Sequence, residues 1–417
     1  MPYTLSPDET IGLDVESTEY LKDHVQAPDR WVLNFGPQHP ATHTTLRLVL
    51  MLDGERVVDA IPDIGYLHSG FEKIGEHLDY NQYVTVTDRM NYISPLANNI
   101  AWHGAVEKLL SLELTPRCKY IRTILAELAR ISDHLLCNGA VGLDVGAFTF
   151  FLYGFYQREV LYDIFETLCG ARFTNSYTRT GGVMADFTPL VIEKIRTFVR
   201  TFPKTLDDME KLLNRNRIFV DRTKGVGVLS KEDATNRSAT GPIARASGVT
   251  RDLRKDEPYL SYADFDFKVC CATAGDCFAR YLVRMGEIRE SLKIVSQAIE
   301  NLPSGPVNVG IDERTALPSK QQVYSTIEGT ISHFEMVMTN RGFVVPNEES
   351  YSAIEAPNGE LGFYLVGDGT DVAYRARCRP PSFIHFSLFP QLIRGHTLSD
   401  IVAVLGSLNI IAAELDR

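Results

Sequence analysis

The stretch from Pro116 to Leu135 reads PRCKYIRTILAELARISDHL and decides the centre of the fold. Its apolar residues recur at intervals of three and four, so a helix that starts just after Pro116 is expected to bury one face. The residues on that face are Ile121, Ile124, Leu125, Leu128, Ile131 and Leu135. Helical patterning begins at about Ile93 and recurs over 150–168, 189–213 and 277–302. Together these segments predict a central helical bundle.

Two of the helical segments carry more specific expectations. The segment 277–302 is predicted to be an amphipathic rod. Its expected inward-facing residues are Leu282, Met285, Ile288, Leu292, Val295 and Ile299. A final helix is predicted to begin near Leu398 and to run almost to the end of the chain.

Strand patterns lie on both sides of the helical region. Apolar and polar residues alternate over 31–52 around a Gly-Pro-Gln-His-Pro loop, and Asp53-Gly54 then predicts a tight turn into a strand over 56–61. Near the other end, 359–366 and 372–378 flank a turn rich in Gly and Asp, which predicts a second hairpin. Strand-rich pieces at both ends of a helical bundle indicate the α+β class.

No strong linker or internal repeat divides the chain, so it is expected to fold as one compact unit. Within that unit the patterning distinguishes four regions. They are an N-terminal lead-in (1–30), an N-terminal β-rich region (31–92), the central helical bundle (93–302) and a C-terminal α+β region (303–417).

The composition is that of a soluble globular protein, with 44% apolar and 23% charged residues in 417. The net charge of −11 argues against a nucleic-acid surface, which needs clustered Lys and Arg. The longest apolar stretch, 145–156, is too short for a membrane span and contains two glycines. The N-terminus lacks the pattern of a signal peptide. We therefore expect a cytosolic chain, and docking on a membrane-embedded partner is compatible with this composition.

The seven cysteines are scattered and contain no C-x-x-C pair. An iron–sulfur cluster usually needs four cysteines with at least one such close pair. Cys270, Cys271 and Cys277 form the only local group. The cysteines are therefore interpreted as reduced packing residues, and this chain is expected to hold no cluster of its own.

The loop Gly36–His43 is the densest polar segment between two apolar strands. Pro40 stands between His39 and His43, so the two histidines do not share a helix face on which they could bind one metal ion. Three interpretations stay open from the residues: a metal site, a surface loop without a role, and a loop that presents an imidazole to a ligand. The last is favoured because histidine exchanges protons near neutral pH.

Tyr92 and Asp144 are two further candidate residues. Tyr92 follows Arg89 and precedes a helix, a position that a packing residue often occupies. Asp144 lies among small and apolar residues, where it either caps the helix that follows or pairs with another group, because an unpaired buried charge is costly. No nucleotide-binding or hydrolase motif accompanies them.

Six sequence blocks, in order along the chain, carry a resemblance to a known family. They are Asn34–His43 with Leu46–Leu48, Gly65–Lys73, Asp88–Tyr92, Arg245–Val249, Gly359–Gly362 and Glu414–Arg417. In this order they closely resemble the D-type subunit of bacterial respiratory complex I, an NADH–quinone oxidoreductase. That family corresponds to the mitochondrial forty-nine-kilodalton subunit and is related to the large subunit of nickel–iron hydrogenases.

The resemblance implies a hydrogenase-large-subunit-like fold whose former metal cavity receives a quinone headgroup. Tyr92 and His43 fall on the two headgroup contacts of the family, Asp144 on the acidic partner of that histidine, and His39 and Arg89 on supporting positions. A phenol and an imidazole beside the quinone carbonyls can polarise them and donate protons. The chain itself is expected to bind no metal or cofactor, and a tetranuclear iron–sulfur cluster in a partner subunit is expected to supply the electrons.

The same resemblance implies a place in a proton-pumping complex, peripheral on the cytoplasmic side of the cell inner membrane. The implied partners are the subunit that carries the terminal cluster, the homologue of the C-type subunit and the membrane subunit at the entrance of the quinone channel. Two alternatives remain. One is a structural subunit that braces the peripheral arm without touching substrate. The other is the large subunit of a membrane-bound hydrogenase.

The hydrogenase alternative requires four thiolate ligands from an R-x-C-G-x-C segment and a terminal D-P-C-x-x-C segment. The aligned positions are Asn91, Ser94, Ile411 and Glu414, none of which offers a thiolate. Two further departures from relatives stand out. Thr174 occupies a position where many family members carry a histidine near the partner's cluster, and Asn409-Ile410 replaces an Asp-Pro-like pair.

Overall fold

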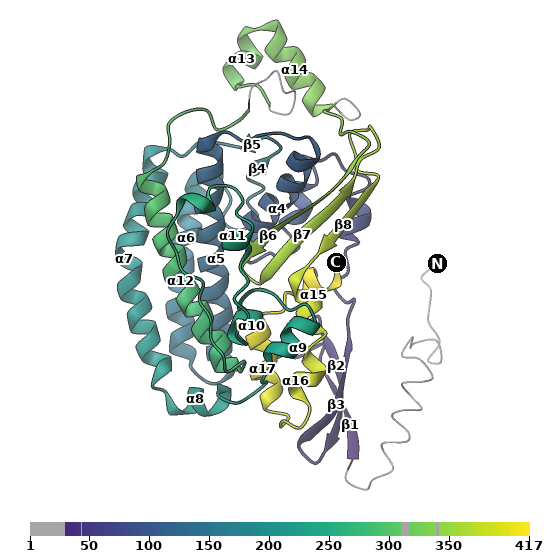
Figure 1. Ribbon diagram of the computed structural model, residues 1–417, viewed down its shortest axis with the longest axis vertical. Helices are drawn as coiled ribbons and strands as arrows, with labels where there is room; N and C mark the ends of the chain where they lie inside the picture. The colour runs from purple at the N-terminus through teal and green to yellow at the C-terminus, as the bar shows by residue number, and fades with distance from the viewer. Residues whose placement is uncertain (1–29, 43, 310–316, 339–341) are drawn as a thin grey trace.

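The computed structural model describes residues 30–42, 44–309, 317–338 and 342–417, so almost all of the expected lead-in lies outside the described residues. Its centre is a bundle of four long helices, shown in Figure 1. They are α5 (Pro116–Asp144), α6 (Phe148–Cys169), α7 (Pro189–Asn214) and α12 (Cys277–Glu300). Helix α5 packs against α6 and α12, and α7 contacts α6 and α12 on their other side. The predicted helices of the bundle and the α+β class are confirmed.

The start of α5 follows directly from the local sequence. The Thr115 side chain accepts a hydrogen bond from the backbone N–H of Cys118, and Pro116 occupies the first turn, where its missing N–H leaves no bond unmade. Helix α7 starts in the same way, because Thr188 accepts from the N–H of Val191. Both helix starts were therefore readable from the sequence.

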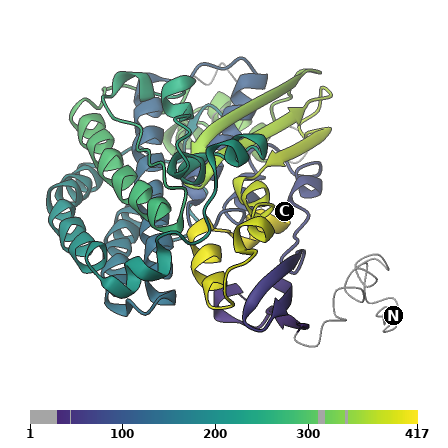
Figure 2. The same ribbon diagram turned by 60° about the horizontal axis from the view of Figure 1, so that its bottom comes forward.

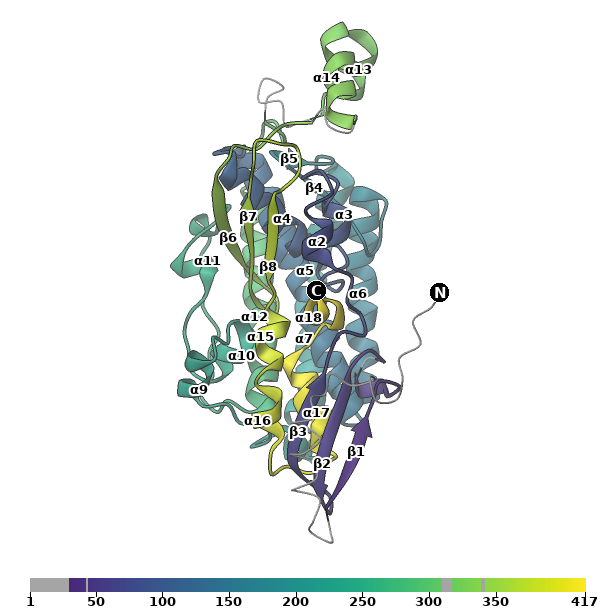
Figure 3. The same cartoon turned by 90° about the vertical axis from the view of Figure 1, so that its right-hand side faces the viewer.

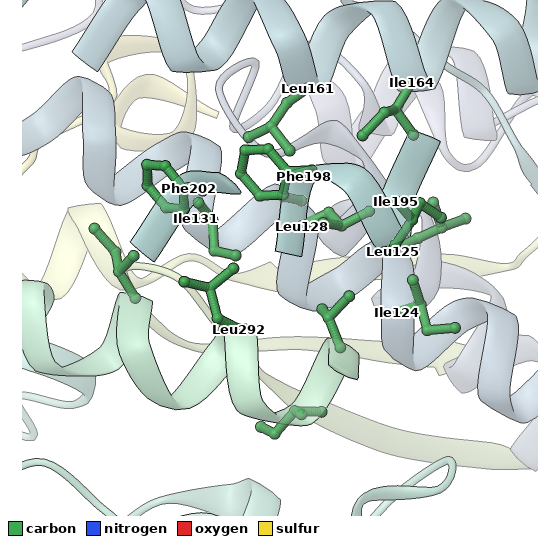
Figure 4. Close-up of a cluster of buried hydrophobic side chains, with 14 of the residues drawn as sticks. Ile124, Leu125, Leu128, Ile131, Leu161, Ile164, Ile195, Phe198, Phe202 and Leu292 are labelled. Atoms are coloured by element: carbon green, nitrogen blue, oxygen red, sulfur yellow. The ribbon is translucent and has the colours of Figure 1, made fainter. Parts of the chain in front are cut away.

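The apolar stripe of α5 is the middle of the core, as Figure 4 shows. Phe198 and Phe202 of α7 stack with ring centroids 4.8 Å apart and close over it. One predicted core residue was wrong: Leu282 is 40% exposed. At 3.6 residues per turn, Leu282 lies about 120° around α12 from Ile288, beyond the edge of the buried face.

The N-terminal hairpin is confirmed as part of a three-stranded antiparallel sheet. Its strands are β1 (Arg30–Phe35), β2 (Arg47–Asp53) and β3 (Arg56–Asp63). A short 3-10 turn, η1 (Pro40–Thr42), lies in the β1–β2 connection. The sheet packs on C-terminal helices, because β3 contacts α16 (Phe389–Ile393) and η1 contacts α17 (Asp400–Leu408). Figure 2 shows this purple sheet beside the yellow C-terminal helices.

A second sheet covers α4 (Pro95–Leu109), which contacts β6 and β7. The predicted hairpin is confirmed as β7 (Gly359–Val366) and β8 (Arg375–Arg379). Strand β8 starts later than predicted because Val372 forms an isolated bridge with Asp79. The sequence patterning missed β6 (Glu349–Ala356), which pairs with β7 along its whole length.

The single C-terminal helix was wrong in extent. Helix α17 ends at Leu408, Asn409 adopts a left-handed conformation with φ of 52°, and a separate helix α18 (Ala412–Asp416) follows. Asparagine tolerates this conformation better than most residues. Arg284 of α12 also donates a 2.7 Å hydrogen bond to the Ser407 carbonyl oxygen, so a side chain distant in sequence caps the end of α17.

Shorter elements complete the described fold. They are α2 (Phe71–Ile74), α3 (Val84–Thr87), β4 (Thr178–Arg179), β5 (Gly182–Val183), α8 (Arg217–Thr223), α9 (Lys231–Asn236), α10 (Gly241–Ala246), α11 (Leu253–Asp256), η2 (Tyr262–Asp264), α13 (Lys320–Ser325), α14 (Ile327–Val337) and α15 (Pro381–Phe386). Figure 3 shows α13 and α14 standing beyond the end of the second sheet. Among the described helices, none is both long and apolar enough to cross a membrane.

Candidate functional site

The histidine loop between β1 and β2 is closed by its own side chains. Thr42 is buried, and its hydroxyl hydrogen-bonds the carbonyl oxygens of Pro37 at 3.1 Å and His39 at 2.8 Å. The His39 Nδ1 atom accepts from the backbone N–H of Ala41 at 3.1 Å, and its ring packs on Phe35. His39 therefore holds the loop in shape. His43, the predicted headgroup contact, lies outside the described residues.

Helix α17 brings this loop and Asp144 to one part of the molecule. The turn η1 contacts α17, and α17 packs against α5, whose last residue is Asp144. The approach is closest at Gly406, where an added Cβ would lie 3.2 Å from Val141 and 3.3 Å from the Asp144 carboxylate. A side chain at this position would have to displace these neighbours by a few tenths of an ångström. The loop and Asp144 thus flank the same short helix.

Asp144 does not cap the helix that follows it. The N-cap of α6 is Ala147, with no side-chain hydrogen bond, so the capping interpretation was wrong. The Asp144 side chain reaches solvent, and surrounding protein atoms still desolvate the carboxyl enough to raise its pKa to about 6. Because the carboxylate is partly desolvated, a nearby cation would stabilise its charged form. Its position leaves it available to a group outside the described residues.

Tyr92 lies half-buried between α3 and α4 and packs on Phe173, with ring centroids 6.4 Å apart. Partial burial raises the pKa of Tyr92, so the phenol keeps its proton at neutral pH. Within the described part of the chain, the hydroxyl makes no hydrogen bond to protein. Tyr92 therefore combines an apolar support with a proton donor that a ligand can use.

The segment before Tyr92 is held by buried polar side chains that the sequence interpretation missed. The Asp88 carboxylate accepts from the Asn99 amide at 2.8 Å and from the Ser176 N–H at 2.9 Å. The Asn98 amide donates to the carbonyl oxygens of Thr87 and Asn91. Two adjacent asparagines among the apolar residues at the start of α4 were the signal available in the sequence. Their bonds fix the backbone that positions Tyr92.

Arg89 is exposed and donates to the carbonyl oxygen of Thr85 in its own turn. Tyr92 and Asp144 are not brought together. Phe173, which supports Tyr92, also packs on Tyr162 of α6, whereas Asp144 precedes the first turn of that helix. At 1.5 Å per residue, Tyr162 lies about 20 Å along α6 from Phe148. The two candidate residues occupy different levels of the bundle.

The four positions aligned with hydrogenase ligands are occupied by groups poorly suited to a soft metal. Asn91 and Ser94 are buried, and the Asn91 amide nitrogen and the Ser94 hydroxyl lack hydrogen-bond partners among the described residues. Glu414 is buried against Ser382, and Ile411 offers no ligand atom. In the described part of the chain, no three His, Cys, Asp or Glu residues gather as a metal site. All seven cysteines are free.

The comparisons with known proteins agree with the sequence blocks. The family described as respiratory-chain NADH dehydrogenase, 49 Kd subunit, matches residues 144–417. The chain belongs to this family. The NADH-quinone oxidoreductase D subunit of Methylacidiphilum infernorum is 49% identical over 413 residues, which cover 98% of each chain. A D subunit of the same enzyme from Opitutus terrae is 50% identical over 389 residues, or 93% of this chain and 91% of that one. The predicted family is confirmed.

The donor set of this family member leads to a first prediction. Purified protein should contain neither nickel nor stoichiometric iron, because an amide, a hydroxyl, an alkyl group and a carboxyl replace the four thiolates. Elemental analysis by mass spectrometry, with zinc as an internal measure of adventitious metal, tests this. About one nickel per chain, retained after treatment with a chelator, would contradict it.

Proposed function

We propose that this chain is the quinone-reducing subunit of a proton-pumping NADH-quinone oxidoreductase and that it forms the quinone headgroup site. The observation that carries this proposal is Tyr92, a protonated phenol in an apolar setting whose hydroxyl has no protein partner among the described residues. The names of the relatives state the enzyme class. The proposed fold ancestry is that of the hydrogenase large subunit, with the former metal cavity adapted to quinone.

The chemistry required of the site is modest. Reduction of a quinone to a quinol takes two electrons and two protons, and an oxygen that accepts an electron becomes a stronger hydrogen-bond acceptor. Tyr92 would hydrogen-bond one carbonyl oxygen and give it one of the two protons, and His43 would deliver the other proton to the second oxygen. Asp144, whose pKa is raised to about 6 by the surrounding protein, would orient and charge-balance that imidazole. Electrons would come from an iron–sulfur cluster in a partner subunit.

The assembly follows from the same proposal. The chain would sit in the peripheral arm on the cytoplasmic side of the inner membrane. It would contact the cluster-bearing subunit, the homologue of the C-type subunit and the membrane subunit at the entrance of the quinone channel. A bracing subunit without substrate contact is the second candidate, because Tyr92 and Asp144 lie at different levels of the bundle.

Replacing Tyr92 with phenylalanine tests the proposal. The variant should fold and assemble, and quinone reductase activity of the complex should fall about tenfold to a hundredfold, because one hydrogen bond worth roughly 1–3 kcal/mol is lost at the transition state. Tyr324→Phe is the matched control, since Tyr324 is 86% exposed on α13. Unchanged activity of Tyr92→Phe with a short-chain quinone at all concentrations would favour the bracing role.

A further inference from the structure

Two buried carboxyl groups outside the proposed headgroup contacts lie near the end of α17. Asp133 of α5 is fully buried, and Glu414 of α18 is 1% exposed. In the described part of the chain, neither carboxyl forms an ion pair with Lys, Arg or His. Carboxyl groups in this situation are uncommon, because burial without a cation strongly disfavours the charged form.

Neutral hydrogen-bond donors hold both carboxyls in place. The Asn409 amide donates to Asp133 Oδ1 at 2.7 Å and also to the side-chain oxygen of Asn358. Asn358 returns a bond of 3.2 Å to the Asn409 carbonyl oxygen. The Ser382 hydroxyl donates to Glu414 Oε2. A pair of asparagines therefore links the surroundings of the two acids.

Each carboxyl also has one oxygen without a hydrogen-bond partner among the described residues. These atoms are Asp133 Oδ2 and Glu414 Oε1, and both are inaccessible to solvent. A buried carboxylate oxygen without a donor is destabilised by the full loss of its hydration. A carboxyl that carries a proton on such an oxygen avoids most of this cost. These two oxygens thus identify where a proton would bind.

The charged groups around the pair lie beside Asp133 and not beside Glu414. His134, Arg284 and Arg158 face Asp133. The His134 ring bonds Glu287 at 2.9 Å, and the other two donate to Ser407 and Ser132. Around Glu414 lie Asp133, Cys378, Ser382 and Asn358, of which none is a cation. The partners of Arg284 and Arg158 are neutral, so both cations favour the charged form of Asp133. None of the groups named around Glu414 does the same for that carboxyl.

We propose that Asp133 and Glu414 form an internal proton-binding site in which at least one carboxyl is protonated at neutral pH. The burial of both carboxyls and their missing donors favour a bound proton, and Glu414 has no cation among the groups named around it. Burial raises the pKa of both acids, to about 7 for Glu414, and the neighbouring Asp133 carboxylate adds to the shift of Glu414. The two groups titrate as a pair, since ionising one makes ionising the other harder. Glu414 is the member that exchanges its proton near neutral pH.

The position of this site connects it with the proposed headgroup region, and its role there rests on the proposed function. Asp133 and Asp144 are three turns apart on α5, about 16 Å, and therefore lie on the same face. Helix α17 covers that face: Cys137 donates to the Gly406 carbonyl oxygen, and Val141 and Asp144 approach Gly406. The pair would hold a proton at the Asp133 end of this face during quinone reduction.

Infrared difference spectroscopy of the purified full chain between pH 5.5 and 8 tests the site without quinone or other subunits. The wild type should show a protonated-carboxyl C=O band that disappears with a midpoint near pH 7. Glu414→Gln should abolish the component with a midpoint near pH 7 and keep the component near pH 6 that belongs to Asp144. Asp133→Asn should shift the Glu414 midpoint to lower pH, because the like charge is removed. Glu328→Gln, on α14, is the control and should leave the band unchanged.

Unfolding measurements give a second readout with a defined sign. A carboxyl whose pKa is raised by folding stabilises the protein below its unfolded pKa, and that contribution is lost as pH rises through about 7. The wild type should therefore lose stability between about pH 4.5 and pH 7 relative to Glu414→Gln, in which the side chain stays neutral. A wild-type spectrum without a carboxyl component that titrates near pH 7, or such a component that survives in Glu414→Gln, would overturn the site. Either result would leave the Tyr92 test of the proposed function unaffected.

Discussion

Replacing Arg245 with methionine should lower the free energy of unfolding by about 3–5 kcal/mol. Arg245 is fully buried and joins α10 to two acids from distant segments, Glu287 of α12 and Glu355 of β6, each at 2.8 Å. Burial alone would raise the pKa of Glu287. Arg245 and His134 outweigh that effect, so the pKa of Glu287 lies well below its usual range. Removing the guanidinium leaves buried carboxylates without their main counter-charge.

Urea denaturation followed by circular dichroism measures this loss. Arg251→Met is the matched control, because Arg251 lies close in sequence and pairs with Glu257 on the surface, where the two side chains are 57% and 71% exposed. Exposed pairs of this kind contribute roughly 0–1 kcal/mol, so the control should remain near the wild type. A loss of under about 1 kcal/mol in Arg245→Met would show that the acids find other partners, such as Arg254 or Arg130.

His43→Ala should reduce quinone reductase activity of the assembled complex by about 10²–10⁴-fold, the range for loss of a general acid. Asp144→Asn should lower turnover less, because it removes the partner of the proton donor. If the two residues act as a pair, the double variant should be only slightly slower than His43→Ala alone. Asp163→Asn, an exposed acid of α6 paired with Arg172, is the control.

The pH dependence gives the same hypothesis a direction. The pKa of Asp144 is raised to about 6, so its carboxylate is available to an imidazolium above that pH and becomes neutral below it. The coupling energy in the double-mutant cycle should therefore be larger at pH 7.5 than at pH 5.5. Strictly additive losses at both pH values would show that His43 and Asp144 work independently.

Much of the local structure was predictable because it depends on neighbours in sequence. The spacing of Ile124, Leu128 and Ile131 determines which face of α5 is apolar, and Thr115 with Pro116 determines where the helix begins. Asp53-Gly54 likewise specifies the β2–β3 turn. The family could be identified from blocks of residues because their order and identity are properties of the sequence.

Other features depend on contacts between distant segments. Leu282 fits an apolar spacing, and whether it is buried depends on which neighbours α12 meets. Helix α17 ends at Leu408 because Arg284 donates a hydrogen bond to the Ser407 carbonyl oxygen and the Asn409 side chain donates one to Asp133. The sequence left Asp144 as a possible helix cap, whereas in the fold Ala147 is the N-cap of α6. These outcomes depend on long-range geometry that no local pattern encodes.

The sequence by itself determined the family, the main helices and the lack of thiolate ligands at Asn91, Ser94, Ile411 and Glu414. Only the tertiary structure placed Asp133 and Glu414 in one buried polar region, although they come from α5 and the last helix. The physical reason is desolvation: an aspartate or glutamate has the same chemistry anywhere in a sequence, and its protonation is decided by the atoms that exclude water from it.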